Sequence, residues 1–280
     1  MSMTREQQQV LEERYGDEDR PAGILWNETV QALINHRTVR CFLPDALPTG
    51  ALETMVAAAQ AASNSSNLHQ WSVVAVSDAE LKARIAAATR KDGSHGNPYI
   101  EQAPVLLLWV ADLGRNNAIT VEEAGSAIVH EYMDSLIMST VDTALAAQNA
   151  AVAAESLGLG VCFLGALRND AQAVATLVGL PAFSYVAFGM AVGVPDPAVR
   201  TRVRPRPAQD VVLHHNAYDL ARAMRGLERY EAPFKAFREE LGMESKTWKD
   251  AVLASATDMA YMAGREDMRA TLEGAGFKLR

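Results

Sequence analysis

The sequence has few cysteines and no uninterrupted apolar segment as long as a membrane span. Cys41 and Cys162 are the two cysteines among 280 residues, too few for a disulfide framework, and they favour a reduced, cytoplasmic compartment. The longest uncharged run covers 171–195, but Gly179 and Pro181 interrupt it. It therefore predicts a short helix followed by a buried strand rather than a membrane span. The first thirty residues lack the apolar core of a signal peptide.

Positive charge is also scarce. The chain has 26 Lys and Arg against 34 Asp and Glu, a formal net charge of −8. This balance argues against general nucleic-acid binding, so any anion site has to be local. Templates for metal and nucleophile chemistry are missing as well: no CxxC pair, no helical histidine pair with a carboxylate, and no GxSxG elbow. We therefore predict no metal site and name no catalytic side chain.

Helical and strand patterns alternate loosely along the chain, with unequal lengths. Apolar runs predict strands at 71–76, 104–112, 161–167 and 184–194. Helical spacing predicts helices at 4–15, 23–36, 49–62, 78–89 and 123–157. No internal repeat is present. The pattern favours an α+β fold with a mixed central β-sheet flanked by helices over a regular doubly wound sheet.

The segment 123–157 is the longest predicted helix. Its apolar residues, among them Met133, Ile137 and Val141, recur every three or four positions. Its second half is rich in alanine, and small side chains let another helix approach closely. It is either a central core helix alone or a core helix that also carries a subunit interface.

Residues 36–42, "HRTVRCF", concentrate positive charge in this acidic chain. Arg37 and Arg40 stand three apart, so one tight turn aims both the same way. Thr38 adds a hydroxyl and His36 a ring donor. Converging donors of this kind suit a phosphate group, which arginine binds through its planar fork. The alternative is a solvated helix end, where cations are favoured in any case.

Two further segments have side chains or backbone suited to a flat ligand. Residues 63–71, "SNSSNLHQW", carry hydroxyl and amide groups that can read a heterocycle or a sugar chain, although the same residues also favour an ordinary turn. Residues 158–169, "GLGVCFLGALRN", place glycines at both ends of a short strand, where a ligand can approach the backbone. An ordinary strand end is the alternative. The segment lacks the GxGxxG order of a dinucleotide-binding turn.

A basic segment, "VRTRVRPRP", covers residues 199–207. Its four arginines alternate along the chain, at Arg200, Arg202, Arg204 and Arg206. In an extended chain alternate residues face one side, and Pro205 and Pro207 favour extension. The segment therefore either lines one side of an anion groove or is a solvated basic linker.

Taken in order, these segments resemble the flavin-dependent nitroreductase superfamily, and most closely its oxygen-insensitive, NADPH-dependent type A group. Residues 141–160, "VDTALAAQNAAVAAESLGLG", are similar to that group's central helix. The resemblance covers about residues 24–219 well and the remainder weakly. It implies an intertwined homodimer with FMN at the subunit interface, and three parts: an N-terminal arm at 1–22, an FMN-binding domain at 23–219, and a C-terminal helical extension at 220–280.

The resemblance also implies a set of FMN-binding residues: His36, Arg37, Thr38, Val39, Arg40, Ser65, Ser66, Asn67, Asn97, Phe163, Leu164, Gly165, Ala166, Arg204 and Arg206. The first five match the motif for the FMN phosphate and ribityl chain. Residues 65–67 match a polar loop from the partner subunit, and Asn97 stands where a glutamine often faces the ring. Residues 163–166 match the strand end near flavin N5, and Arg204 and Arg206 match a basic pair beside the phosphate.

The sequence departs from the family pattern at several positions. His69 replaces a glutamine, Ala166 replaces a glycine, and Thr38 replaces a serine while keeping the hydroxyl. The arginine pair near the C-terminal Thr247-Trp248 is missing, so Lys246 or Arg238 is the substitute for the NADPH 2′-phosphate contact.

The activity implied is hydride transfer from NADPH, in preference to NADH, through bound FMN to nitroaromatics, quinones or similar small electron-poor acceptors, by a ping-pong mechanism. This describes a cytoplasmic oxidoreductase that binds neither nucleic acid nor membrane. The alternatives are a free-flavin, azo or activated-alkene reductase of the same fold, and a flavin-binding sensor without turnover.

Overall fold

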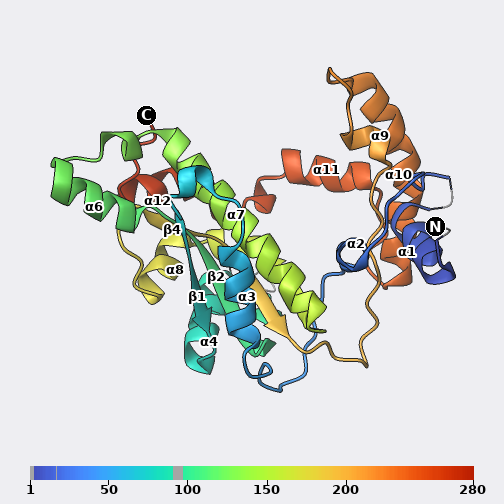
Figure 1. The fold of residues 1–280 in the computed structure, drawn as a ribbon, viewed down its shortest axis with the longest axis horizontal. Helices are drawn as coiled ribbons and strands as arrows, with labels where there is room; N and C mark the ends of the chain where they lie inside the picture. The colour runs from blue at the N-terminus through green and yellow to red at the C-terminus, as the bar shows by residue number, and fades with distance from the viewer. Residues whose placement is uncertain (1–2, 17, 91–96) are drawn as a thin grey trace. The chain divides into compact units, whose positions relative to one another are not determined.

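The computed structural model describes residues 3–16, 18–90 and 97–280 (Figure 1). They divide into two compact units. Unit 1 combines residues 1–37 with 200–261, and unit 2 combines 38–199 with 262–280. Each unit is thus assembled from segments that are far apart in the sequence. These boundaries cut across the ranges 1–22, 23–219 and 220–280 expected from the sequence.

Unit 2 is built on a sheet of four strands within the described residues. They are β1 (Trp71–Val76), β2 (Val105–Asp112), β3 (Gly160–Leu164) and β4 (Ser184–Gly193), in the order β1-β2-β4-β3. The three strand pairs are antiparallel. A parallel bridge between Thr38 and Val161 makes the pairing mixed at the β3 edge. Four strands are found where apolar runs predicted them, but the strand predicted at 161–167 ends at Leu164 because the chain turns into a 3-10 helix at Gly165. The α+β class is confirmed.

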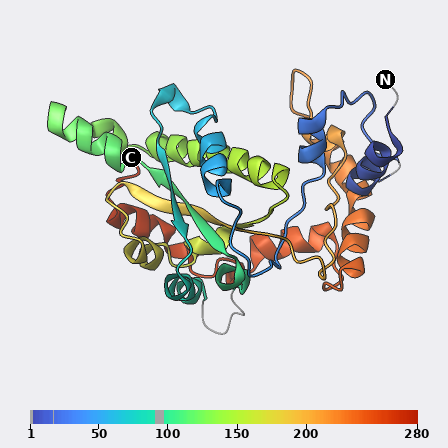
Figure 2. The ribbon, with the colours of Figure 1, turned by 60° about the horizontal axis from the view of Figure 1, so that its bottom comes forward.

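Helices cover both faces of this sheet (Figure 2). On one face lie α3 (Ala51–Gln60) and α7 (Met133–Ser156). The opposite face is covered by α4 (Ala79–Ala88), α5 (Tyr99–Gln102), α8 (Ala171–Leu177) and the short turn η3 (Gly165–Arg168). At one end of the sheet, α12 (Met268–Gly274) and the residues after it add Leu272 and Phe277 to the core.

The small side chains of α7 let α3 and the sheet pack close to it. Ala146, Ala150 and Ala154 are fully buried against the α3 residues Met55 and Ala59. The predicted close helix contact is therefore confirmed. The helix is shorter than predicted because α6 (Gly114–Ala124) ends at Gly125 in a left-handed conformation, and η2 (Ile128–Glu131) separates it from α7. The helix α6 was not predicted.

Unit 1 is helical, with α1 (Arg5–Tyr15), α2 (Glu28–Ile34), α9 (Gln209–Val212), α10 (Leu220–Glu240) and α11 (Trp248–Thr257). A capping box at Thr4 begins α1. The helix α2 begins later than predicted, because the side chain of Asn27 caps it by accepting from Val30 N at 2.8 Å. In the described part of the chain, no helix is both long and apolar enough to cross a membrane.

Candidate functional site

Residues 38–42 run beside β3 and the end of β4. Val39 N donates to Val161 O at 3.0 Å, and Leu43 N donates to Val194 O at 2.9 Å. A Cβ atom built on Gly160 would lie 2.6 Å from Val39 Cβ, closer than real carbon contacts. The glycine at position 160 therefore lets the basic segment approach the strand. This contact places Thr38, buried Val39 and exposed Arg40 beside β3.

Arg40 interacts with two side chains of unit 2, the thiol of Cys162 and the hydroxyl of Tyr99. Burial raises the pKa of both groups, and the guanidinium of Arg40 acts in the opposite direction. Both groups are therefore neutral near pH 7 and do not neutralise the charge of Arg40. Tyr99 also donates to Asn97 Oδ1 at 2.5 Å. Tyr99 thus contacts both Asn97 and Arg40 and links these two predicted residues.

The C-terminal end of β3 presents an aromatic ring to solvent. Phe163 is 39% exposed, and its ring centroid lies 5.6 Å from that of Phe188. Leu164 is buried, while Gly165 and Ala166 are partly exposed at the start of η3. Because successive residues of a strand point to opposite faces, Phe163 and Cys162 lie on different faces of the sheet. Asn97 bonds to Tyr99, which interacts with Cys162. Asn97 therefore lies on the Cys162 face of the sheet, and Phe163 points to the other face.

The polar loop around Ser65 has an unusual backbone. Ser66, Asn67 and His69 all have positive φ, at 51°, 57° and 49°, a conformation that costs energy for residues other than glycine and persists where the surroundings hold it. Ser65 N donates to Asp142 Oδ1 on α7 at 2.9 Å. The other carboxylate oxygen of Asp142, Oδ2, is buried and has no hydrogen-bond partner among the described residues.

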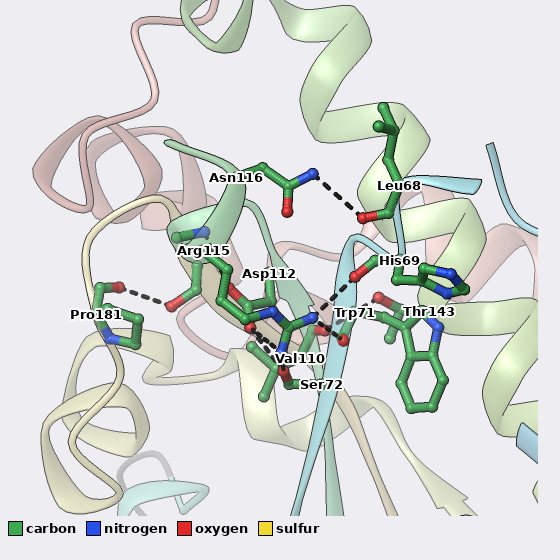
Figure 3. Close-up of polar contacts among 12 residues, drawn as sticks. Leu68, His69, Trp71, Ser72, Val110, Asp112, Arg115, Asn116, Thr143 and Pro181 are labelled. Carbon is green, nitrogen blue, oxygen red and sulfur yellow. Dashed lines mark hydrogen bonds and ion pairs between the residues drawn. The ribbon is translucent and has the colours of Figure 1, made fainter. Parts of the chain in front are cut away.

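The first turn of α6 holds the end of this loop (Figure 3). The guanidinium of Arg115 donates to His69 O and Trp71 O, at 2.8 and 3.0 Å, and to Ser72 Oγ. Asn116 Nδ2 donates to Leu68 O at 3.2 Å. These side chains fix the strained loop from outside it. Neither was predicted, and the sequence around α6 carries no pattern that links it to residues 68–72.

Within one copy of the chain, the polar loop and the β3 end lie at opposite edges of the sheet. The loop leads into β1, whereas Phe163 belongs to β3, and β2 and β4 lie between these two strands. Three strand spacings amount to about 14 Å. The structure therefore does not bring Ser65, Ser66 and Asn67 together with Phe163 in a single copy.

The remaining predicted residues, His36, Arg37, Arg204 and Arg206, belong to unit 1. Arg37 Nε donates to Thr201 Oγ1 at 3.2 Å, which links the two basic segments. Val203 and Pro205 are buried, while Arg204 is half-buried and Arg206 exposed. Burial therefore alternates along the segment from Val203 to Arg206, and not from Arg200 to Arg202. The guanidinium of Arg204 lies 5.4 Å from the ring centre of Phe237, and that of Arg202 pairs with Glu240.

The substitutes predicted for the NADPH 2′-phosphate contact both bind one residue, Glu244, Arg238 at its backbone carbonyl and Lys246 at its carboxylate. Arg238 Nε donates to Glu244 O at 2.8 Å, and Lys246 Nζ lies 3.0 Å from Glu244 Oε2. The two cations are therefore close to each other and partly balanced by Glu244. In the described ranges, no group of three or more His, Cys, Asp or Glu side chains is placed to hold a metal ion.

Comparison with known proteins gives consistent matches. The profile of the Nitroreductase family matches residues 33–194, and that of the Nitroreductase family, C-terminal domain, matches 204–280. A protein of Bacillus subtilis described as FMN reductase (NADPH) is 34% identical over 236 residues, which cover 81% of this chain and 90% of that protein.

Solved structures agree with the sequence matches. The hypothetical oxidoreductase YcnD from Bacillus subtilis superposes with a TM-score of 0.83 at 28% identity, covering 91% of this chain and all of that one. The NfrA1 nitroreductase from the same organism gives a TM-score of 0.80 at 30% identity, covering 90% of this chain and 99% of that one.

Proposed function

The chain belongs to the nitroreductase family, and from this premise we propose that it is an FMN-dependent oxidoreductase that uses NADPH to reduce small electron-poor acceptors such as nitroaromatics and quinones. The observation that carries the proposal is the contact of residues 38–40 with β3. It holds Arg40 against β3 at the face of Cys162, and the same strand exposes the Phe163 ring on its other face. The relative named FMN reductase (NADPH) supports the choice of both cofactors.

The residues present suit FMN chemically. The guanidinium of Arg40 interacts with two neutral side chains, Tyr99 and Cys162, and Thr38 adds a hydroxyl beside it, a donor set that fits a phosphate. The absence of a Cβ at Gly160 keeps this donor set against the strand. Bound FMN would supply the hydride chemistry, accepting from NADPH and donating to the acceptor in a ping-pong sequence. The side chains bind and orient, and water supplies the proton.

The site in this proposal is shared between two copies of the chain. Met133, Ile137, Val141 and Leu145 form a stripe on α7, with exposed fractions of 42, 52, 49 and 44%. Residues four apart lie on one face of a helix, so these side chains make a continuous apolar surface opposite the buried alanines. A second copy packed on this stripe covers its apolar side chains. The polar loop of the second copy then completes the site at the β3 edge of the first copy. The proposal is therefore a homodimer with FMN at the subunit interface.

The proposal also gives roles to the unit 1 cations. His36, Arg37, Arg204 and Arg206 contribute donors for the FMN phosphate, and Arg238 with Lys246 recognise the 2′-phosphate that distinguishes NADPH from NADH. A reaction that draws on NADPH, in a chain whose Cys41 and Cys162 are free thiols, fits a cytoplasmic enzyme.

The test is an anaerobic visible spectrum of the purified protein before and after NADPH is added, with NADH in a parallel sample. Yellow protein that bleaches with NADPH and recovers its colour on addition of a nitroarene or a quinone is the expected result. A colourless protein that takes up no added FMN would contradict the proposal. Yellow protein that neither donor bleaches would support the flavin-binding sensor instead.

A second candidate is free-flavin reduction, which the name of the Bacillus subtilis relative, FMN reductase (NADPH), favours. Steady-state rates on a panel of free FMN, nitroarenes, quinones, azo dyes and activated alkenes separate the two. If free FMN is reduced with a kcat/KM well above that of every other acceptor, the second candidate holds.

A further inference from the structure

Arg14 is a buried cation in α1, the helix that the sequence analysis treated as an N-terminal arm. It is only 5% exposed, whereas arginines are almost never buried unless their donors are satisfied. Leu11, on the same helix, is 1% exposed. The helix α1 therefore packs into unit 1 through an apolar side chain and a charged one, and the charged one requires acceptors.

The acceptors of Arg14 are backbone carbonyl groups of the two basic segments. Its Nη2 donates to Ile34 O at 2.6 Å and to His36 O at 2.7 Å, and its Nη1 donates to Arg204 O at 2.8 Å. In return, Arg206 N donates to Arg14 O at 2.7 Å. Arg14 thus joins the start of "HRTVRCF", at His36, to "RPRP", at Arg204 and Arg206.

The helix α10 makes further contacts with the segments that Arg14 joins. Tyr230 on α10 is buried and donates to Pro205 O at 2.8 Å. Arg229 on the same helix pairs with Asp19, after α1, and with Asp210, after the basic segment. Figures 1 and 2 show α1 and α2 beside α10 within unit 1. The basic segment from Arg204 to Arg206 therefore lies between α1 and α10 and is bonded to both.

The helix α1 stands outside the part of the chain that matches the family profile, which begins at residue 33. We infer that Arg14 is a positioning residue for the phosphate-binding cations: its guanidinium fixes the spacing between His36 and Arg37 on one segment and Arg204 and Arg206 on the other. This inference rests on the proposed function. The planar fork of arginine serves this role because it donates to several carbonyl groups at fixed angles, which the single ammonium group of lysine does not.

The test compares two flavins that differ in the phosphate. The apoprotein of the full chain is titrated with FMN and with riboflavin, following flavin fluorescence, for wild type, Arg14→Ala, Arg14→Lys and the control Arg5→Ala, an exposed arginine of the same helix. Both Arg14 variants are expected to lose roughly tenfold in FMN affinity while riboflavin affinity changes less than about twofold. The control keeps the wild-type ratio.

Each other outcome has a definite meaning. Arg14 variants that keep the wild-type ratio of FMN to riboflavin affinity overturn the inference, and so do variants that lose both flavins equally, because that result describes a general structural role. If Arg14→Ala does not fold, Arg14→Lys and Arg14→Gln are compared by the same ratio. A wild-type chain that takes up neither flavin overturns the proposed function itself and the inference with it.

Discussion

At Gly160 the packing of the chain depends on the absence of a side chain. The backbone of residues 38 and 39 pairs with β3, and Val39 occupies the space that a Cβ at position 160 would need. From the sequence, the glycine is expected to be a point of close approach for a ligand. In the structure, the approaching group within the chain is Val39. A glycine in a strand indicates close approach but does not identify the neighbour.

Gly160→Ala should therefore weaken the contact between Val39 and β3. The added carbon lies 2.6 Å from Val39 Cβ, so we expect a loss of about 1–3 kcal/mol in the free energy of unfolding, as for overpacked sites. Urea denaturation measures it. Gly274→Ala is the matched control, since nothing lies within 4 Å of its added carbon in α12, and alanine there should stabilise by about 0.5–1 kcal/mol. Equal destabilisation of both variants would contradict the account.

His130 should make stability depend on pH. Burial lowers its pKa, while an unfolded histidine titrates near pH 6.5. As the pH falls, the unfolded chain therefore takes up the proton first. The contribution of the neutral ring to stability is complete above about pH 6.5 and is lost as the pH falls towards the lower, folded-state pKa.

His130→Gln should flatten this part of the stability profile, measured by urea denaturation at several pH values from about 7.5 down to 5. The exposed His215 supplies the control His215→Gln, which should keep the wild-type slope. If His130→Gln also keeps the wild-type slope, the pH dependence does not come from His130.

Among the elements, strands were predicted more accurately than helices, for a physical reason. The strand β2 is buried from Leu106 to Asp112, and β4 is nearly so throughout, so continuous apolar runs mark them directly. The polar helix α6 has no buried residue, and the sequence analysis therefore did not detect it. Its contribution to the site, through Arg115 and Asn116, was missed with it.

The helix α7 has two different faces, and only one of them is occupied by its own chain. Apolar spacing predicted the helix, but spacing alone does not tell a core face from an interface. The exposed stripe at Met133, Ile137, Val141 and Leu145 was recognisable only once the buried alanine face had been assigned.

Val141→Asp should separate the proposed dimer into monomers. The side chain is 49% exposed in the single chain, so a carboxylate is tolerated there by the isolated copy but not against an apolar partner. Sedimentation velocity gives the mass, and circular dichroism checks the fold. Val212→Asp, at a 72% exposed valine in unit 1, is the control and should leave the mass unchanged. A folded Val141→Asp variant that still sediments as a dimer would remove the stripe from the proposed interface.

At the scale of the whole molecule, the predicted site draws on segments that are far apart in the sequence. Motif order identified the family and the fold. It did not show that residues 36–37 and 204–206 belong to one unit and residues 38–40 to the other, nor that the polar loop and β3 lie at opposite sheet edges. Long-range arrangement of this kind depends on contacts such as those of Arg14, which no local pattern marks.

Sharing of the site between copies can be tested by complementation. One chain carries Arg40→Ala. The other carries Ser66→Gly and Asn67→Gly, which leave the left-handed backbone accessible. Each alone should have little NADPH-dependent activity. After unfolding and refolding an equal mixture, half of the dimers are mixed and each has one intact site, so about a quarter of wild-type activity should return.

Two controls complete this experiment. A mixture in which both chains carry Arg40→Ala should stay inactive, and so should a mixture of the two variants that is combined without unfolding and assayed before subunits exchange. If the refolded mixture of different variants gains no activity, the loop and the β3 end act within one copy.

The hydrogen bond from Arg14 to Arg204 can form only after both residues have been synthesised. Arg14 and Arg204 are 190 residues apart, so at ribosomal speeds of about 5–20 residues per second the acceptor emerges roughly 10–40 s after the donor. The helix α1 leaves the ribosome with two side chains that are buried in the final structure, Leu11 and Arg14, before the acceptor at Arg204 has been made. Unit 2, whose segment 38–199 is contiguous, is complete except for its last residues by then. The helix α1 is therefore synthesised well before the segment whose carbonyl group accepts from Arg14.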